Sequence, residues 1–155
     1  MLVALLATSL VLSCSKKDNL KPTPSPSTDL IVGKWMTIAT VADRPVYHWN
    51  TTELVTNLWD REKDCIKDDL IVFKPDNTFY GDEGASKCDA SAPQIQDGGT
   101  WKKSGTSLIL IEDGVEYTYT INQLDDTSLV VTGRRFYIIN NDTTFFMATV
   151  TYKKQ

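Results

Sequence analysis

The chain has little of the chemistry on which most enzymes and nucleic-acid-binding proteins depend. Its 155 residues include one histidine, His48, so a histidine-based triad or a multi-histidine metal centre would have to be built on this side chain alone. Basic residues are outnumbered, 16 Lys plus Arg against 20 Asp plus Glu, which argues against the basic face that displaces counterions from phosphate. The G-x-S-x-G, P-loop and H-E-x-x-H motifs are absent. We therefore expect a protein that is not an enzyme, needs no cofactor or metal and binds no nucleic acid.

The apolar run at residues 2–13, LVALLATSLVLS, has 12 residues and is too short to span a bilayer. Its length suits the hydrophobic region of a signal peptide, although no Lys or Arg precedes it. It ends in Val11-Leu12-Ser13-Cys14, which resembles the bacterial lipobox. The alternative is a buried N-terminal helix, which we disfavour because an unpatterned apolar stretch beside a polar linker has no other face to cover.

The resemblance to the lipobox implies cleavage before Cys14 and lipidation of that cysteine, which attaches the protein to a membrane. Residues 15–28 are polar, with three prolines at every second position, and this composition favours an extended spacer. Ser15 rather than Asp follows the cysteine, which resembles an outer-membrane destination. We expect a signal peptide at 1–13, a lipidated cysteine and Pro/Ser-rich linker at 14–28, and a barrel domain at 29–155. The expected location is the cell envelope, at the outer membrane, with the domain facing the periplasm or the surface.

The rest of the chain predicts eight strands separated by turn signals. They are expected at residues 30–40, 69–74, 78–81, 99–103, 107–112, 115–124, 128–139 and 143–154. Pro75-Asp76-Asn77 and Asp113-Gly114 have the composition of tight turns, and Gly133 suggests a bulge or bend. A short helix is expected over residues 51–60, capped by Asn50.

Eight sequential strands without room for crossover helices predict an all-β, antiparallel, up-and-down arrangement. Closure into an eight-stranded barrel would remove the exposed edges. A two-sheet sandwich is the alternative, and periodicity does not distinguish the two.

Two sets of residues resemble a known family. Gly33-Lys34-Trp35 resembles the G-x-W motif of the lipocalins, whose tryptophan plugs the closed end of the barrel. Cys65, Asp68-Asp69 and the segments FKPDNTF, DEGASKCD and GTW, with the lipobox and the final TYKK, resemble the lipocalin-like domain of small bacterial lipoproteins. The resemblance spans residues 30–155 and implies a calycin-type barrel on an envelope lipoprotein.

Cys65 and Cys88 fall in the first and third connections between strands, which emerge at the same end of an up-and-down barrel. Outside the cytoplasm such a pair is expected to form a disulfide. Metal ligation is the weaker alternative, because no further Cys or His lies at ligand spacing.

Acidic residues gather in the same two connections. They suit solvated loops better than a calcium site, because the nearest EF-hand alignment puts Lys87 where the bidentate Glu belongs. A glycosidase pair is a further alternative without support from spacing. The residues are Asp60, Glu62, Asp64, Asp68, Asp69, Asp82, Glu83 and Asp89.

Aromatic side chains are the remaining candidates for a site. Four are expected to line the barrel interior and two to lie near its mouth; in that order they are Tyr117, Tyr119, Phe136 and Phe146, then Trp59 and Tyr80. The alternative is that they fill the core. Two functions follow: a lipid-anchored envelope protein that binds a small hydrophobic or amphipathic ligand, or a filled-core structural or protein-interaction module that acts through the first and third connections. The sequence names no protein partner.

Overall fold

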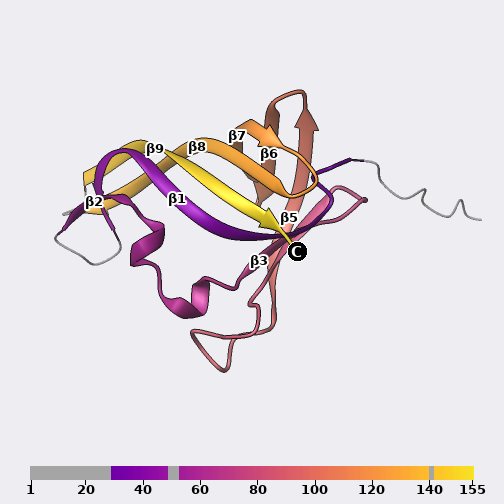
Figure 1. Cartoon of the computed structure of the whole chain (residues 1–155), viewed down its shortest axis with the longest axis horizontal. Coiled ribbons are helices and arrows are strands. Elements are labelled where there is room, and N and C mark those ends of the chain that lie inside the picture. The colour runs from indigo at the N-terminus through magenta and orange to yellow at the C-terminus, as the bar shows by residue number, and fades with distance from the viewer. Residues whose placement is uncertain (1–28, 49–52, 140–141) are drawn as a thin grey trace, which may run out of the picture.

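The computed structural model describes residues 29–48, 53–139 and 142–155. In these residues two 3-10 helices, η1 and η2, interrupt an otherwise all-β arrangement (Figure 1). The strands are β1 (Gly33–Tyr47), β2 (Leu54–Asn57), β3 (Leu70–Phe73), β4 (Thr78–Asp82), β5 (Ile95–Ser104), β6 (Ser107–Glu112), β7 (Val115–Leu124), β8 (Ser128–Ile139) and β9 (Asp142–Lys154). The all-β class predicted from the sequence is confirmed.

The strands from β3 to β9 pair with their neighbours in order, and every pairing is antiparallel. β1 pairs with β3 along one edge and with β9 along the other, which closes β1 and β3 to β9 into the predicted eight-stranded barrel. The ninth strand, β2, lies outside this circle and pairs with the end of β1. Because every strand of the barrel has two partners, closure satisfies the sheet edges that a sandwich would leave open.

The helix expected over residues 51–60 is wrong for the part that the structure describes. Leu54–Asn57 form β2, with Val55 opposite Val46, and only the three residues Trp59–Arg61 are helical, as η1. A second 3-10 turn, η2, spans Asp64–Ile66. The free edge at the end of β1 offers backbone hydrogen bonds, and this tertiary pairing overrides the helical pattern of the apolar residues. The predicted cap, Asn50, lies outside the described residues.

The predicted turns form as their composition requires. Asn77 has φ 63° and its N–H donates to the carbonyl of Lys74, while Asp113 and Gly114 have φ 50° and 78°, as a type I′ hairpin demands. The bulge suggested at Gly133 lies instead on β7, where the register shifts between Ile121 and Gln123. Gly133 sits in a regular ladder, and its lack of a side chain leaves room for the ring of Tyr119.

Trp35 occupies the closed end of the barrel. It is completely buried, and its indole Nε1 donates to the carbonyl of Ile31 at 2.6 Å. The ammonium group of Lys154, in the last strand, lies 4.9 Å from the centre of its ring. Gly33 has φ +139°, a conformation that side chains rarely adopt, and a Cβ there would meet the Lys154 side chain. The G-x-W segment thus supplies both the turn into β1 and the side chain that fills this end.

The buried apolar residues form two separate clusters. The larger fills the barrel, with members on almost every strand: Ile31, Trp35, Phe73, Phe79, Trp101, Leu108, Tyr119, Ile121, Leu129, Val131 and Val150. The smaller consists of Ala42, Val46, Phe146 and Ala148, packed against Leu58 and Tyr137. It lies where β1, β8 and β9 continue past their neighbours, because β7 pairs with β8 only as far as Gly133. We call this extension, formed by β2 with residues 41–47, 134–139 and 142–148, the arm; it lies on the left in Figure 1.

None of the helices in the described parts of the chain is long and apolar enough to cross a membrane.

Candidate functional site at the open end of the barrel

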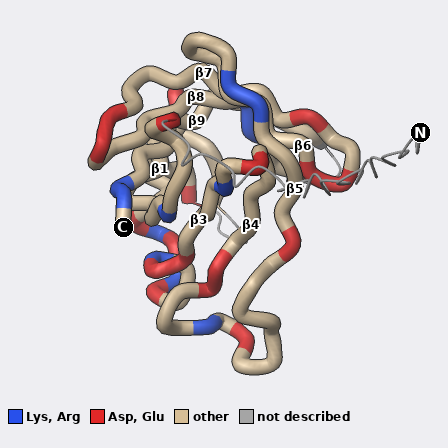
Figure 2. The backbone as a smooth tube through the Cα atoms, turned by 90° about the vertical axis from the view of Figure 1, so that its right-hand side faces the viewer, with Lys and Arg blue, Asp and Glu red and all other residues tan. Residues whose placement is uncertain are grey.

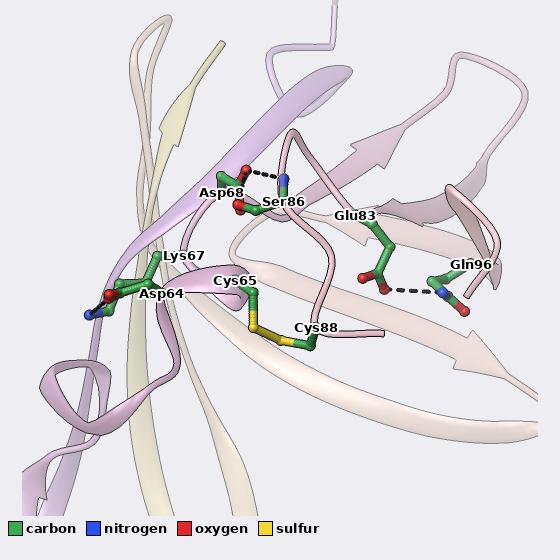
Figure 3. Close-up of a disulfide and its surroundings, with 8 residues drawn as sticks. All are labelled: Asp64, Cys65, Lys67, Asp68, Glu83, Ser86, Cys88 and Gln96. Atoms are coloured by element: carbon green, nitrogen blue, oxygen red, sulfur yellow. Dashed lines mark hydrogen bonds and ion pairs between the residues drawn. A yellow bond between two sulfur atoms is a disulfide. The ribbon is translucent and has the colours of Figure 1, made fainter. Parts of the chain in front are cut away.

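A disulfide ties together two connections at the end opposite Trp35. Cys65, in η2, bonds to Cys88, in the segment between β4 and β5, and their Cα atoms are 5.2 Å apart (Figure 3). The predicted pairing is confirmed. The bond joins the β2–β3 connection to the β4–β5 connection, so neither can move far from the barrel without the other.

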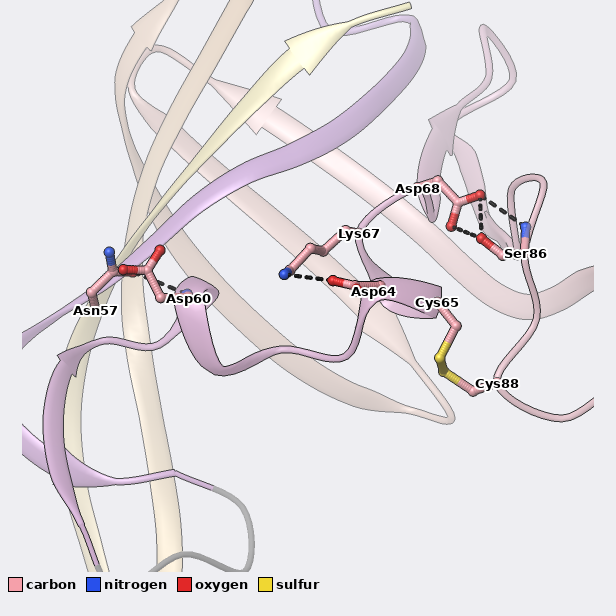
Figure 4. A network of polar contacts seen from close by, with 8 residues as sticks. All are labelled: Asn57, Asp60, Asp64, Cys65, Lys67, Asp68, Ser86 and Cys88. Carbon is pink, nitrogen blue, oxygen red and sulfur yellow. Dashed lines mark hydrogen bonds and ion pairs between the residues drawn. A yellow bond between two sulfur atoms is a disulfide. The ribbon is translucent and has the colours of Figure 1, made fainter.

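Asp68 makes a second link between the same connections (Figure 4). Its carboxylate accepts hydrogen bonds from the backbone N–H groups of Ala85 and Ser86 at 2.7 and 2.8 Å and from the Ser86 hydroxyl at 2.9 Å. The side-chain hydrogen bond from Ser86, followed by the one from its backbone, lowers the pKa of Asp68 below its ordinary value. Gly84 permits this approach because a Cβ there would collide with the backbone of Asp68.

The pKa of the neighbouring Asp69 is shifted in the opposite direction. Burial raises the pKa of its carboxyl to about 6, and the charges of Glu83, Asp68 and Asp82 act in the same direction. One of its oxygens, Oδ1, is buried and has no hydrogen-bond partner in the described structure. Figure 2 shows acidic residues spread along the loops below β3 and β4. Even so, the described part of the chain brings together no group of three His, Cys, Asp or Glu side chains that could hold a metal ion.

His48 lies at the end of β1 and is buried. Its Nε2 is 3.1 Å from Oε1 of Glu62, in the segment after η1. The contact joins the end of β1 to the segment between η1 and η2.

The structure separates the six predicted aromatic residues by face. Tyr119 and Phe146 point inward and are buried, Tyr119 in the barrel cluster and Phe146 in the arm cluster. Tyr117 shares the inner face of β7 with Tyr119 but is 40% exposed. Trp59 lies in η1 and is half-buried.

The expectation that Phe136 lines the interior is wrong. It is 57% exposed and lies opposite Phe145 on the outer face of the arm, with the ring centres 6.1 Å apart. Tyr80 also points outward, because it alternates with the buried Phe79, and the Lys74 ammonium group lies 4.8 Å from its ring centre. Phe136 and Tyr80 therefore point outward, whereas Phe146 points inward.

We call the open end of the barrel, where exposed side chains lie above a packed core, the mouth. Leu108, Tyr119 and Leu129 are buried in the layer that forms its floor. Above them, on the inner face of β7, Tyr117 and Val115 are 40% and 52% exposed. Two surface hollows lie elsewhere: one is bordered by Trp101 and Lys103, and the other by Lys34, Met36 and Asp68.

Arg135 is the residue of this mouth that the sequence prediction missed. It stands opposite Phe146 in the β8–β9 ladder and therefore points inward, and its guanidinium lies 5.6 Å from the ring centre of Tyr119. Strand alternation could have identified it, because Leu129, Val131 and Gly133 are the preceding residues on that face of β8. The dipeptide Arg134-Arg135 gives no local sign of which arginine faces in.

A closed antiparallel barrel with a tryptophan plug at one end and a loop-bordered mouth at the other defines the lipocalin-like class. The chain matches the family described as "Lipocalin-like domain" over residues 31–131, from the plug to the middle of β8. The chain therefore belongs to the lipocalin-like domain family. Comparison with curated proteins gives no match.

Proposed function

We propose that this is a lipid-anchored cell-envelope protein whose lipocalin-like barrel binds a small hydrophobic or amphipathic ligand at its open end. The observation that carries the ligand-binding part is the exposure of Tyr117 and Val115 on the inner face of β7, above a closed floor of packed side chains. Exposed apolar groups beside a few polar groups are typical of the lining of small-molecule sites. The barrel core below them is filled, so the ligand is held by the mouth rather than inside the barrel.

The anchoring part rests on the sequence, since residues 1–28 lie outside the described residues. The apolar run that ends at Cys14, and the proline-rich segment that follows, have the order of an export signal, a lipid attachment point and a spacer. The Cys65–Cys88 disulfide is in keeping with an oxidising compartment outside the cytoplasm. We propose the outer membrane as the destination, with the barrel domain beginning at residue 29.

Expression in a bacterial host should yield a membrane-bound protein that begins at Cys14 and carries acyl chains. Each buried methylene of such a chain contributes about 0.8 kcal/mol, so two or three chains hold the protein on the membrane. Mass spectrometry of the protein from the membrane fraction measures the modification, and Cys14→Ser is the control that should lose it. An unmodified mass at Cys14 in the wild-type chain contradicts the anchor.

Binding at the mouth should depend on Tyr117 and not on Phe136. Both aromatics are exposed, so either can be replaced by alanine with little loss of stability, but they lie on opposite faces of the sheet. We expect Tyr117→Ala to weaken the binding of a neutral fluorescent probe, N-phenylnaphthylamine, by roughly tenfold, as the loss of one apolar contact surface predicts. The matched control, Phe136→Ala, should leave the dissociation constant unchanged.

Absence of probe binding to the wild-type protein, or equal losses in the two variants, contradicts a ligand site at the mouth. The alternative function is a structural or protein-interaction module that acts through the β2–β3 and β4–β5 connections. The filled barrel core favours it, because such a module needs no cavity. The ordering of both connections by Cys65–Cys88 and Asp68 would then serve to present a fixed surface.

A further inference from the structure

Two consecutive arginines on β8 face opposite sides of the sheet. Arg134 stands opposite Met147 on the outer face, and its guanidinium lies 3.6 Å from the ring centre of Phe145. Arg135 stands opposite the buried Phe146 and points toward the mouth. Strand alternation therefore places one positive charge outside and one inside, on adjacent residues of the same strand.

An aromatic ring lies beside the Arg135 side chain. Its guanidinium lies 5.6 Å from the ring centre of Tyr119, whose ring rests over Gly133. In the parts of the chain that the structure describes, no carboxylate lies within ion-pair distance of this guanidinium. Among the described residues Arg134 also lacks such a partner, so Arg135 is distinguished from it by the inner face on which it lies.

Tyr152, on β9, lies on the closed-end side of Arg135. It is half-buried, packs against the barrel cluster, and lies within the electrostatic influence of Arg135. Burial raises its pKa to about 12, so the phenol keeps its proton at neutral pH and can donate a hydrogen bond. Tyr152 stands opposite Leu129, in the layer that forms the floor, and Arg135 lies nearer the open end, opposite Phe146.

The next residues on the inner faces supply an apolar wall. Tyr119 and Gly133 are the last pair of the β7–β8 ladder, and Tyr117 and Arg135 are the next inward-facing residues on their strands, beyond the paired part. A guanidinium presents a planar fork of N–H groups that suits a carboxylate, and such charge-assisted hydrogen bonds are about twice as strong as neutral ones. The exposed ring of Tyr117 and the side chain of Val115 can meanwhile cover an apolar tail.

We propose that Arg135 makes the mouth selective for anionic amphipaths, with a carboxylate head at the guanidinium and the apolar tail against Tyr117 and Val115. The proposal rests on the ligand-binding function above and specifies the chemical class of the ligand. Arg135 is a binding residue in this scheme, and no bond is made or broken.

Isothermal titration calorimetry with three probes of equal tail length, decanoate, decanol and decylammonium, tests the charge preference at neutral pH. We expect the wild-type protein to bind decanoate roughly tenfold more tightly than decanol, and decylammonium most weakly. Arg135→Gln should bind decanoate and decanol equally, while Arg135→Lys should keep part of the preference. Arg134→Gln is the matched control, since it removes the same charge from the outer face, and it should keep the whole preference.

The outcomes separate this proposal from the proposed function. Equal binding of decanoate and decanol by the wild-type protein, or the same loss of preference in Arg134→Gln and Arg135→Gln, overturns the role of Arg135 and leaves a ligand-binding mouth. Tightest binding of decylammonium also overturns it. A wild-type protein that binds none of the three probes overturns both. Because Arg135 is exposed, we expect its variants to fold, and an unchanged thermal midpoint verifies this.

Discussion

Trp35→Ala is expected to lower the free energy of unfolding by about 3–5 kcal/mol, the usual cost of deleting a fully buried large aromatic side chain. The indole is completely buried, so its removal leaves a cavity at the closed end of the barrel. It also deprives the Ile31 carbonyl of its 2.6 Å hydrogen bond. Because domains of this size are stable by about 5–15 kcal/mol, the loss is a large share of the total.

Urea denaturation measures the effect, and two further variants show where it arises. Trp35→Phe keeps most of the volume and removes only the hydrogen bond, so it should lose clearly less and should fold even where the alanine variant does not. Trp59→Ala removes a half-buried tryptophan from η1, outside the barrel wall, and should cost much less than Trp35→Ala. If Trp35→Ala cost no more than Trp59→Ala, Trp35 would not be the main support of the closed end.

The second large effect is expected from the double variant Cys65→Ser/Cys88→Ser. The bond spans 23 positions in sequence, and closing a loop of that length in the unfolded chain corresponds to about 3 kcal/mol of stability. We expect the double variant to lose about this amount while its barrel strands remain paired, because both cysteines lie in connections rather than in strands.

Denaturation of the oxidised protein, the double variant and the protein treated with a reducing agent measures the contribution. The reduced wild-type protein should match the double variant. Cys14→Ser, compared with wild-type protein that carries no lipid at Cys14, is the control, since it removes the cysteine that lies outside the described residues. Alkylation of Cys65 and Cys88 in unreduced protein, or a double variant as stable as the wild type, would contradict the prediction.

The fold was largely predictable from the sequence because turn chemistry is local. Asn77 and Asp113-Gly114 adopt the positive φ angles that their composition requires, and the strands between such turns pair with their neighbours in order. Strand ends were less predictable: β1 continues to Tyr47 and β5 begins at Ile95, beyond the predicted limits. These extra residues are strands because a partner edge is available, and that edge lies far away in sequence.

The site was less predictable because it depends on which face each residue presents. The aromatic residues were found, but Phe136 was assigned to the wrong face, and Arg135 beside it was not considered. A shift of one residue along a strand exchanges the two faces, so an assignment from composition alone can interchange neighbours. The register against the buried Phe146 and Ala148 fixes the faces, and that register requires the folded barrel.

The pairing of β1 with β9 also bears on the order of folding events. The two strands pair from Trp35 opposite Lys154 to Ala42 opposite Ala148, and the Lys154 ammonium group donates to the Leu30 carbonyl across a separation of 124 residues. Contacts so distant in sequence form late and slow the folding reaction. During synthesis, this edge of β1 therefore has no partner until β9 has emerged from the ribosome. In a protein that is exported unfolded, this delay would keep the barrel from closing in the cytoplasm before β9 has been synthesised.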